Sequence, residues 1–122
     1  MLDFSNSKIL IVGDVMLDKY YFGKVDRISP EAPVPIVNIQ KEESRLGGAS
    51  NVANNIVSLG GHSLLCGVIG HDLFGKEIER ISRHKNIDTF LLKTSSPTIT
   101  KARIIGGKQQ IVRVDYEDKS EL

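Results

Sequence analysis

Apolar residues follow two patterns along the chain, and these patterns predict two kinds of β-strand. Short, nearly continuous apolar runs are typical of strands that are covered on both faces in a parallel sheet. They occur at residues 8–12, 62–69 and 89–92. Alternation of polar and apolar residues is typical of strands with one exposed face. It occurs at residues 36–40, 98–105 and 109–116, and Gly106-Gly107 between the last two predicts a hairpin.

Two further segments repeat apolar residues with the 3.6-residue period of an amphipathic helix. The first spans residues 49–59 and is followed by Gly60, a common helix stop. The second begins after Asp72, whose side chain can cap a helix N-terminus. Residues 20–35 contain three of the four prolines, which predicts an extended and irregular segment before the first helix.

The order strand, excursion, helix, strand, helix, strand predicts an α/β fold that begins a wound parallel sheet. Residues 8–18 and 47–93 are expected to form this core. Residues 20–46 and 98–116 are expected to form a smaller, half-exposed sheet that stands apart from it. Residues 1–122 would together belong to one domain.

Composition excludes several classes of protein. The chain has 122 residues, 40% of them hydrophobic, with 16 Lys and Arg against 15 Asp and Glu, so its net charge is +1. This balance is typical of a globular domain and argues against nucleic-acid binding, which favours a basic surface. No signal peptide and no apolar run of membrane-spanning length is present, which predicts a cytoplasmic protein without membrane contact. Cys66, the single cysteine, lies in an apolar run and is expected to be a buried structural thiol; neither it nor the scattered histidines form a zinc pattern.

The sharpest motif is Gly47-Gly48-Ala49-Ser50-Asn51-Val52-Ala53. Two glycines before a helix let a ligand approach the backbone, and the first helical turn offers free N–H groups. The Asn51 amide lies off the apolar stripe and can face a polar ligand. Spacing alone supports equally well a tight turn with a surface asparagine. The Walker and dinucleotide-binding patterns both fail, because the required lysine and glycine cluster are absent at their positions.

With Gly60 and Gly70 at fixed spacing, this motif resembles the N-terminal signature of the ribokinase-like (PfkB) carbohydrate kinases. Residues 13–18 resemble the end of that family's first strand, and residues 70–75 its Gly-x-Asp-x-x-Gly turn. The resemblance covers nearly the whole chain. It implies an ATP-dependent sugar kinase with a three-layer α/β/α fold, of which this chain is the N-terminal part of the parallel sheet plus a small β lid.

The resemblance also implies a set of substrate-binding residues. Asp18 aligns with the aspartate that holds sugar hydroxyls, and Gly47, Gly48 and Asn51 would supply backbone and amide contacts. Asp14 would either bind the sugar or only cap the end of its strand.

A phosphate on the sugar needs cations. Lys101 and Arg103 are two residues apart on a strand and point to one face, so they are candidate phosphate ligands, with a solvated charged strand as the alternative. Arg113 would join them only if the hairpin loop has an odd length, because a shift of one residue moves it to the other face. Arg27 would either reach the substrate or pair with Glu31.

A narrower resemblance connects residues 13–20, 27–35 and 100–103 to the branch of the family that phosphorylates heptose 7-phosphate at C1. It implies ADP-heptose synthesis for lipopolysaccharide, a bifunctional enzyme with an adenylyltransferase half, ATP and Mg as cofactors, and a homodimer formed through the lid sheet. The alternatives are another sugar kinase of the family, or a non-catalytic lid and dimerisation module.

The catalytic part of the family's pattern does not occur in this sequence. The Gly-Ala-Gly-Asp motif that carries the family's catalytic base is absent. The resemblance therefore implies that the base aspartate lies C-terminal to Leu122, together with the ATP site. No catalytic residue is expected within these 122 residues, which would be inactive alone.

Overall fold

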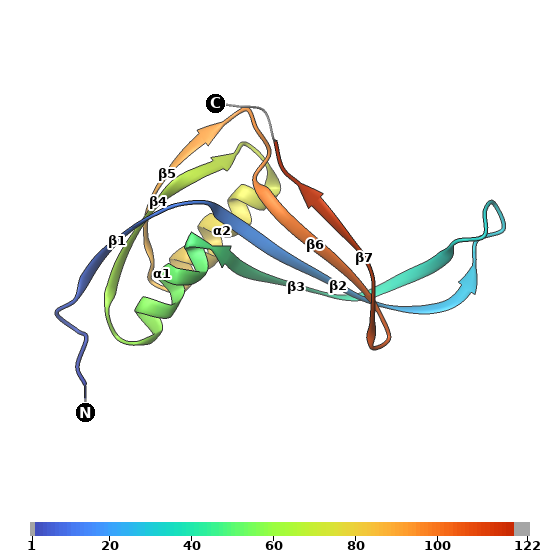
Figure 1. Cartoon of the computed structure of the whole chain (residues 1–122), viewed down its shortest axis with the longest axis horizontal. Coiled ribbons are helices and arrows are strands. Elements are labelled where there is room, and N and C mark those ends of the chain that lie inside the picture. Colours follow the sequence, from blue (N-terminus) through green and yellow to red (C-terminus); the bar gives the residue numbers. More distant parts are fainter. Residues whose placement is uncertain (1, 119–122) are drawn as a thin grey trace.

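A computed structural model describes residues 2–118 and confirms the α/β class (Figure 1). Its elements follow one another in chain order. They are β1 (Lys8–Val12), β2 (Val15–Ile28), β3 (Pro35–Gly48), α1 (Ala49–Ser58), β4 (His62–Gly70), α2 (Leu73–His84), β5 (Asp88–Thr94), β6 (Ile99–Gly106) and β7 (Gln109–Tyr116). The strands form two sheets, one with the order β1-β4-β5 and one with the order β3-β2-β6-β7.

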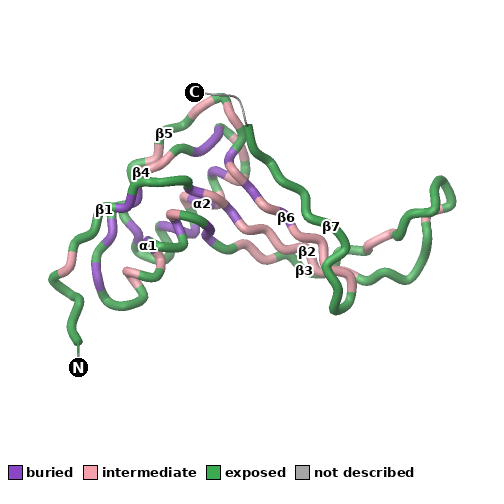
Figure 2. Tube along the Cα trace, viewed as in Figure 1, coloured by how far each residue is buried: buried purple, intermediate pink, exposed green. Residues whose placement is uncertain are grey.

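The first sheet is entirely parallel, as the apolar runs predict. Helices α1 and α2 cover one of its faces, where the core gathers around Leu65, Ile69 and Ile78 (Figure 2). The opposite face is open in the described residues, with apolar side chains that are 42–74% exposed. They are Leu10, Val12, Leu64, Val68, Phe90 and Leu92. The prediction of cover on both faces is thus met on one face only. Cys66 lies on β4 and is half-buried rather than buried.

The second sheet is mixed, because β2 pairs antiparallel with β3 and parallel with β6, while β6 and β7 form the predicted hairpin. We call it the lid sheet. Strand β2 passes from the core into the lid sheet: Val15 and Leu17 are 1% and 0% exposed within the core cluster. Residues 23–40 continue beyond β6 and β7 as a two-stranded arm (Figure 1).

Residues 20–35 are extended, as expected, but the irregular part is confined to the turn between the two strands. Strand β2 continues to Ile28, and β3 begins at Pro35. Pro30 and Pro33 lie in the connecting turn. Pro35 is the first residue of a strand, a position where proline's missing N–H does not interrupt the hydrogen bonds inside the sheet. The ribbon also bends at two register shifts, at Phe22/Gly23 and Val25/Arg27, which local sequence does not announce.

Local signals at the helix ends are confirmed. Helix α1 starts directly after Gly48, whose φ of 55° lies in the left-handed region that favours glycine. Asp72 caps α2 by accepting a hydrogen bond from the Gly75 N–H at 2.8 Å. Because α1 and α2 follow the ends of β3 and β4, the turns before both helices lie near the junction between the two sheets.

Leu122 is the residue after which the sequence predicts the catalytic base. It lies outside the described residues, which end at Asp118. The expected position of the base, C-terminal to Leu122, therefore stays a prediction.

Candidate functional site

Two neighbouring strands of the lid sheet bring together the predicted carboxylate and cations. In the β2–β6 register, Asp18 is opposite Lys101 and Tyr20 is opposite Arg103. Side chains two residues apart on a strand point to the same face. Asp18, Lys101 and Arg103 therefore share one face of the lid sheet, although they come from strands that are far apart in sequence.

Asp18 and Arg103 form an ion pair. Arg103 Nη1 donates a hydrogen bond to Asp18 Oδ1 at 3.0 Å. The side chain of Asp18 is 24% exposed and that of Arg103 is 23% exposed. This hydrogen bond is the largest influence on the pKa of the Arg103 guanidinium and raises it, so the cation is retained at every working pH. The pair is only partly desolvated, so solvent screens it and ligand groups can compete for it.

Gly47 and Gly48 are in close contact with neighbouring groups near this pair. A Cβ at Gly47 would lie 2.7 Å from Asp18 Oδ2, and a Cβ at Gly48 would lie 2.4 Å from the carbonyl oxygen of Asp14. The missing side chain at Gly47 thus lets the carboxylate lie against the backbone at the start of α1. The first glycine therefore accommodates a neighbouring side chain of the protein, a role that the sequence prediction of ligand approach did not include.

Asn51 and Asp14 are both exposed. Asn51 lies in the first turn of α1, off the buried side of the helix, as predicted. The backbone of Asp14 accepts the Ala49 N–H at 2.8 Å, so this residue supports the start of α1 through its carbonyl. Its carboxylate makes no hydrogen bond within residues 2–118, and both interpretations of that side chain stay predictions.

Arg113 lies on the same face as Arg103, directly opposite it in the β6–β7 register. The hairpin loop is even, since Gly106 pairs with Gln109, and this alone would send Arg113 to the other face. The register shifts between Ile104 and Ile105, however, where the partners change from Val112 to Gln110. This bulge skips one residue and reverses the orientation of everything that follows on β7.

The structure adds two residues that sequence reasoning missed. The Tyr20 ring contacts two guanidinium groups, with 4.7 Å from its centroid to Arg45 Cζ and 5.4 Å to Arg103 Cζ. Arg45 is the register partner of Asp18 on β3. The position of Tyr20, two residues after Asp18, was a signal for the shared face. Arg45 carried no local signal, because its placement needs the β2–β3 pairing.

Helix α2 is tied to the lid sheet at two points. Lys19 Nζ donates to Ser44 Oγ at 3.0 Å and pairs with Glu77 Oε1 at 3.2 Å, and Ser44 also donates to Glu77. At the other point, Asp72 accepts hydrogen bonds from both the backbone N–H and the hydroxyl of Thr98, at 2.9 and 2.6 Å. These ties fix the strands that carry Asp18 and Arg103 relative to the core.

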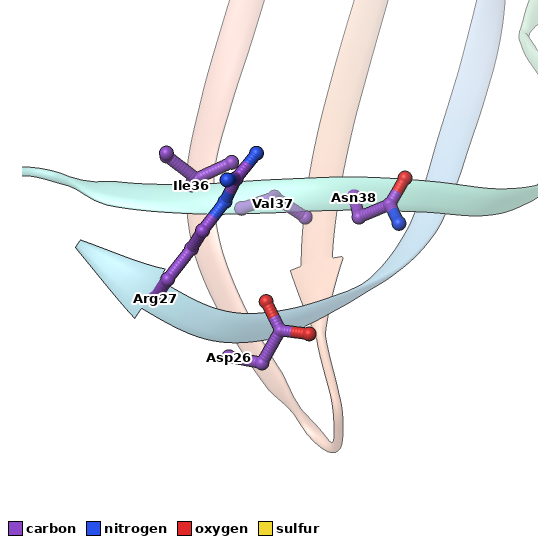
Figure 3. A pocket seen from close by; sticks show the side chains of 5 residues that line it. All are labelled: Asp26, Arg27, Ile36, Val37 and Asn38. Carbon is purple, nitrogen blue, oxygen red and sulfur yellow. The ribbon is translucent and has the colours of Figure 1, made fainter. Parts of the chain in front are cut away.

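One hollow lies away from these residues, in the distal arm. Its volume is about 580 Å³, and it is lined by Asp26, Arg27, Ile36, Val37 and Asn38 (Figure 3). The Arg27 side chain extends across it toward β3 (Figure 3). No ion pair joins Arg27 to Glu31 within the described range. The hollow is an open gap of a twisted ribbon, and we assign the candidate site to the charged lid face instead.

Two kinds of site find no support in the described part of the chain. Between residues 2 and 118 there is no group of three or more His, Cys, Asp or Glu side chains that could hold a metal ion. Neither α1 nor α2 is long and apolar enough to cross a membrane. The lid face itself offers a carboxylate for hydroxyl groups next to guanidinium and ammonium groups for an anion.

Comparison with known proteins decides the family, since residues 6–122 match the pfkB family of carbohydrate kinases. The chain belongs to this family. Over 118 residues it is 50% identical to D-beta-D-heptose 7-phosphate kinase of Bordetella bronchiseptica, an alignment that covers 96% of this chain and 38% of that protein. Over 115 residues it is 52% identical to the bifunctional protein HldE of a Nitratiruptor species, covering 94% of this chain and 25% of that protein. The chain thus spans between a quarter and two fifths of these relatives.

Solved structures confirm the fold of this PfkB chain. A carbohydrate kinase from Agrobacterium tumefaciens superposes with a TM-score of 0.70 at 18% identity, over 89% of this chain and 35% of that one. A fructokinase with bound ATP from Xylella fastidiosa gives a TM-score of 0.64 at 22% identity, over 91% and 33%. The prediction of a ribokinase-like sheet with a β lid is therefore confirmed.

Proposed function

We propose that the complete protein containing these residues is an ATP-dependent kinase. It transfers the γ-phosphoryl group to the C1 hydroxyl of D-glycero-β-D-manno-heptose 7-phosphate, and residues 1–122 supply the sugar-binding part and the lid. The observation that carries this proposal is the lid face, where the carboxylate of Asp18 lies beside Arg103 and opposite Lys101. A sugar phosphate presents both hydroxyl groups and a dianion, which are the two kinds of partner that this face offers. Identity of about 50% to a heptose 7-phosphate kinase supports this sugar over others.

Each residue has a role in this proposal. Asp18 accepts hydrogen bonds from sugar hydroxyls, and Gly47 and Gly48 let the sugar lie against the backbone before α1. Asn51 contributes amide contacts from the first turn of α1. The phosphate at the far end of the sugar is bound by Lys101 and Arg103. Arg113, on their face, and Asp14, near the start of α1, are secondary candidates.

ATP and Mg belong to the complete protein in this proposal and not to these residues. The described chain offers no cluster of metal ligands, and the sequence lacks the Gly-Ala-Gly-Asp motif. In this proposal the catalytic base and the nucleotide site lie C-terminal to Leu122, as the family resemblance implies, in the part of the longer relatives that this chain does not match. The open apolar face of the parallel sheet supports this, because a large exposed apolar patch marks a surface that another element covers. On its own, residues 1–122 would be inactive.

The assembly and the cellular role follow the resemblance. We propose that two copies pair through their lid sheets, since β7 is exposed throughout and forms the edge of its sheet. Sedimentation of the complete protein as a strict monomer would contradict this pairing. The reaction product would enter ADP-heptose synthesis for lipopolysaccharide in the cytoplasm. The Nitratiruptor relative is named a bifunctional protein and the Bordetella relative a kinase, so a second, adenylyltransferase half is left open in this proposal.

A coupled assay of the complete protein tests the proposal. With ATP and Mg, we expect the highest kcat/KM for heptose 7-phosphate, with the 1,7-bisphosphate as product. Ribose, fructose and fructose 6-phosphate serve as competing substrates. A higher kcat/KM for one of these would assign the chain to another sugar kinase of the family. The absence of turnover with every sugar would leave the lid and dimerisation module as its role.

A further inference from the structure

The Asp18–Arg103 ion pair joins the residue expected to bind the sugar hydroxyls to a residue expected to bind the phosphate. Arg103 is one of the expected phosphate ligands, yet its Nη1 donates to the carboxylate that is expected to hold the sugar. The Tyr20 ring, 5.4 Å from Arg103 Cζ, packs against the guanidinium and limits its movement. The two recognition elements are therefore physically connected before any ligand binds.

The other guanidinium groups of this face already have carboxylates of their own. Arg45 Nη2 lies 3.0 Å from Glu43 Oε2 on the same strand. Arg113 Nε lies 2.9 Å from Asp115 Oδ1, and Nη2 makes a second bond to the same carboxylate. Both arginines are therefore paired with a carboxylate of their own strand, and neither depends on a carboxylate of β2.

Arg103, in contrast, pairs across the strands with Asp18. Lys101 lies between two carboxylate-bearing residues in the register, Asp18 on β2 and Asp115 on β7. Within residues 2–118, Lys101 has no ion-pair partner. Because Asp115 already pairs with Arg113, the two cations Lys101 and Arg103 together with the single carboxylate of Asp18 leave an excess of one positive charge on this face. A phosphate monoester, with a charge of about −1.5 to −2 at pH 7, neutralises that excess.

We propose that Arg103 is a specificity-determining residue that makes sugar binding depend on the phosphate. When a phosphate is present, it offers Arg103 a better partner and releases Asp18 Oδ1 for the sugar hydroxyls. When the sugar lacks a phosphate, its hydroxyls must compete with Arg103 for the same oxygen. Discrimination against the unphosphorylated sugar thus arises from an ion pair within the protein as well as from lost phosphate contacts. This inference rests on the proposed function.

The test compares heptose 7-phosphate with unphosphorylated heptose in the complete protein. For wild type, about 10- to 100-fold of the preference in kcat/KM is attributed to this pair, the effect of one charge-assisted hydrogen bond. Arg103→Gln lowers kcat/KM for heptose 7-phosphate and raises that for unphosphorylated heptose, since Asp18 is then free. Lys101→Gln is the matched control: it removes the same charge from the same strand and lowers only the phosphorylated reaction, with no gain for unphosphorylated heptose.

A second measurement supplies the substrate in two pieces. Phosphite dianion added to unphosphorylated heptose should raise its turnover by wild type, because the anion draws Arg103 away from Asp18. The same addition should have little effect on Arg103→Gln. Arg103→Lys, which retains the charge but not the planar fork, should show partial activation and guards against a glutamine variant that fails to fold.

The possible failures are distinguishable. If wild type turns over no heptose 7-phosphate, the proposed function fails. If it does, but phosphite gives no activation or Arg103→Gln and Lys101→Gln change both sugars alike, the exchange at Asp18 is wrong while the kinase assignment stands.

Discussion

The junction at Asp72 provides the sharpest prediction of stability, and the perturbation is Asp72→Ala. One carboxylate serves two elements: it accepts the Gly75 N–H at 2.8 Å as the cap of α2, and it accepts the Thr98 N–H at 2.9 Å and hydroxyl at 2.6 Å. Thr98 is 1% exposed and immediately precedes β6. Truncation therefore removes a helix cap and leaves a buried backbone donor without an acceptor.

The two losses can be estimated separately. Removal of an N-cap side chain costs about 1 kcal/mol. A buried donor that loses its partner costs about 1–3 kcal/mol. The free energy of unfolding should therefore fall by about 2–4 kcal/mol, a large share of the roughly 5–15 kcal/mol typical of a domain. Asp72→Asn keeps one acceptor oxygen and should lose about half as much.

The same contacts give the effect a pH dependence. Burial is the largest single influence on the Asp72 carboxyl and raises its pKa, but the hydrogen bonds from Thr98 and Gly75 together outweigh it, and the pKa is lowered. A carboxyl whose pKa is lowered by folding stabilises the fold above its unfolded pKa of about 3.9 and loses that contribution as the pH falls through the folded value. The difference between wild type and Asp72→Asn should be constant near neutral pH and narrow below about pH 4.

Urea unfolding and amide hydrogen exchange of the complete protein measure these effects. We expect hydrogen-exchange protection at the amides of Thr98 and Gly75 to fall more than protection at the other amides of α2. Asp88→Ala is the matched control, because this exposed carboxylate makes no hydrogen bond or ion pair within residues 2–118; it should change stability by less than about 0.5 kcal/mol. An Asp72→Ala variant as stable as Asp88→Ala, or unchanged exchange at Thr98, would overturn this prediction.

Three further substitutions separate binding from packing. Gly47→Ala places a methyl group 2.7 Å from Asp18 Oδ2, so the carboxylate must move. The KM for the sugar should rise about tenfold or more, which is the effect of losing one charge-assisted hydrogen bond. An unchanged KM would argue against contact between this carboxylate and the sugar. Glu77→Gln removes the negative charge that pairs with Lys19, whose side chain is 12% exposed. The free energy of unfolding should fall by about 1–2 kcal/mol, and this loss should be smaller in high salt. A loss that does not depend on salt would indicate a packing effect instead. Ile78→Ala opens a cavity at a fully buried position and should lower the free energy of unfolding, measured by chemical denaturation, by about 2–5 kcal/mol. The KM for the sugar should stay as in wild type. A changed KM would mean that packing of the core affects the geometry of the site.

Features governed by neighbouring residues were predictable from sequence. The cap at Asp72 and its partner Gly75 are three residues apart, the spacing that a helix start requires. The hairpin at Gly106-Gly107 likewise depends on local backbone preferences. The apolar runs of β1 and β4 predicted a parallel sheet, because burial imposes the same composition wherever the strands pair.

Features governed by strand pairing were not predictable. The prolines predicted an irregular segment over residues 20–35, yet Pro30 and Pro33 lie in the turn and the strands continue on both sides of it. Arg45 reaches the candidate site only through the β2–β3 register. The orientation of Arg113 depends on a single bulge, and no residue near Ile104 marks it in the sequence.

The candidate site combines features set by neighbouring residues with features set by strand pairing. Asp18 follows Leu17, which is 0% exposed in the core, so the carboxylate lies on a strand whose opposite face is fixed. Arg103 lies on β6, whose start is tied through Thr98 to Asp72 and so to α2. Both partners of the ion pair are therefore positioned by the core. A hinge between β2 and β6 would break their parallel ladder, so the two strands hold Asp18 and Arg103 as one unit, whereas beyond Gly106 only β2 and β3 remain paired.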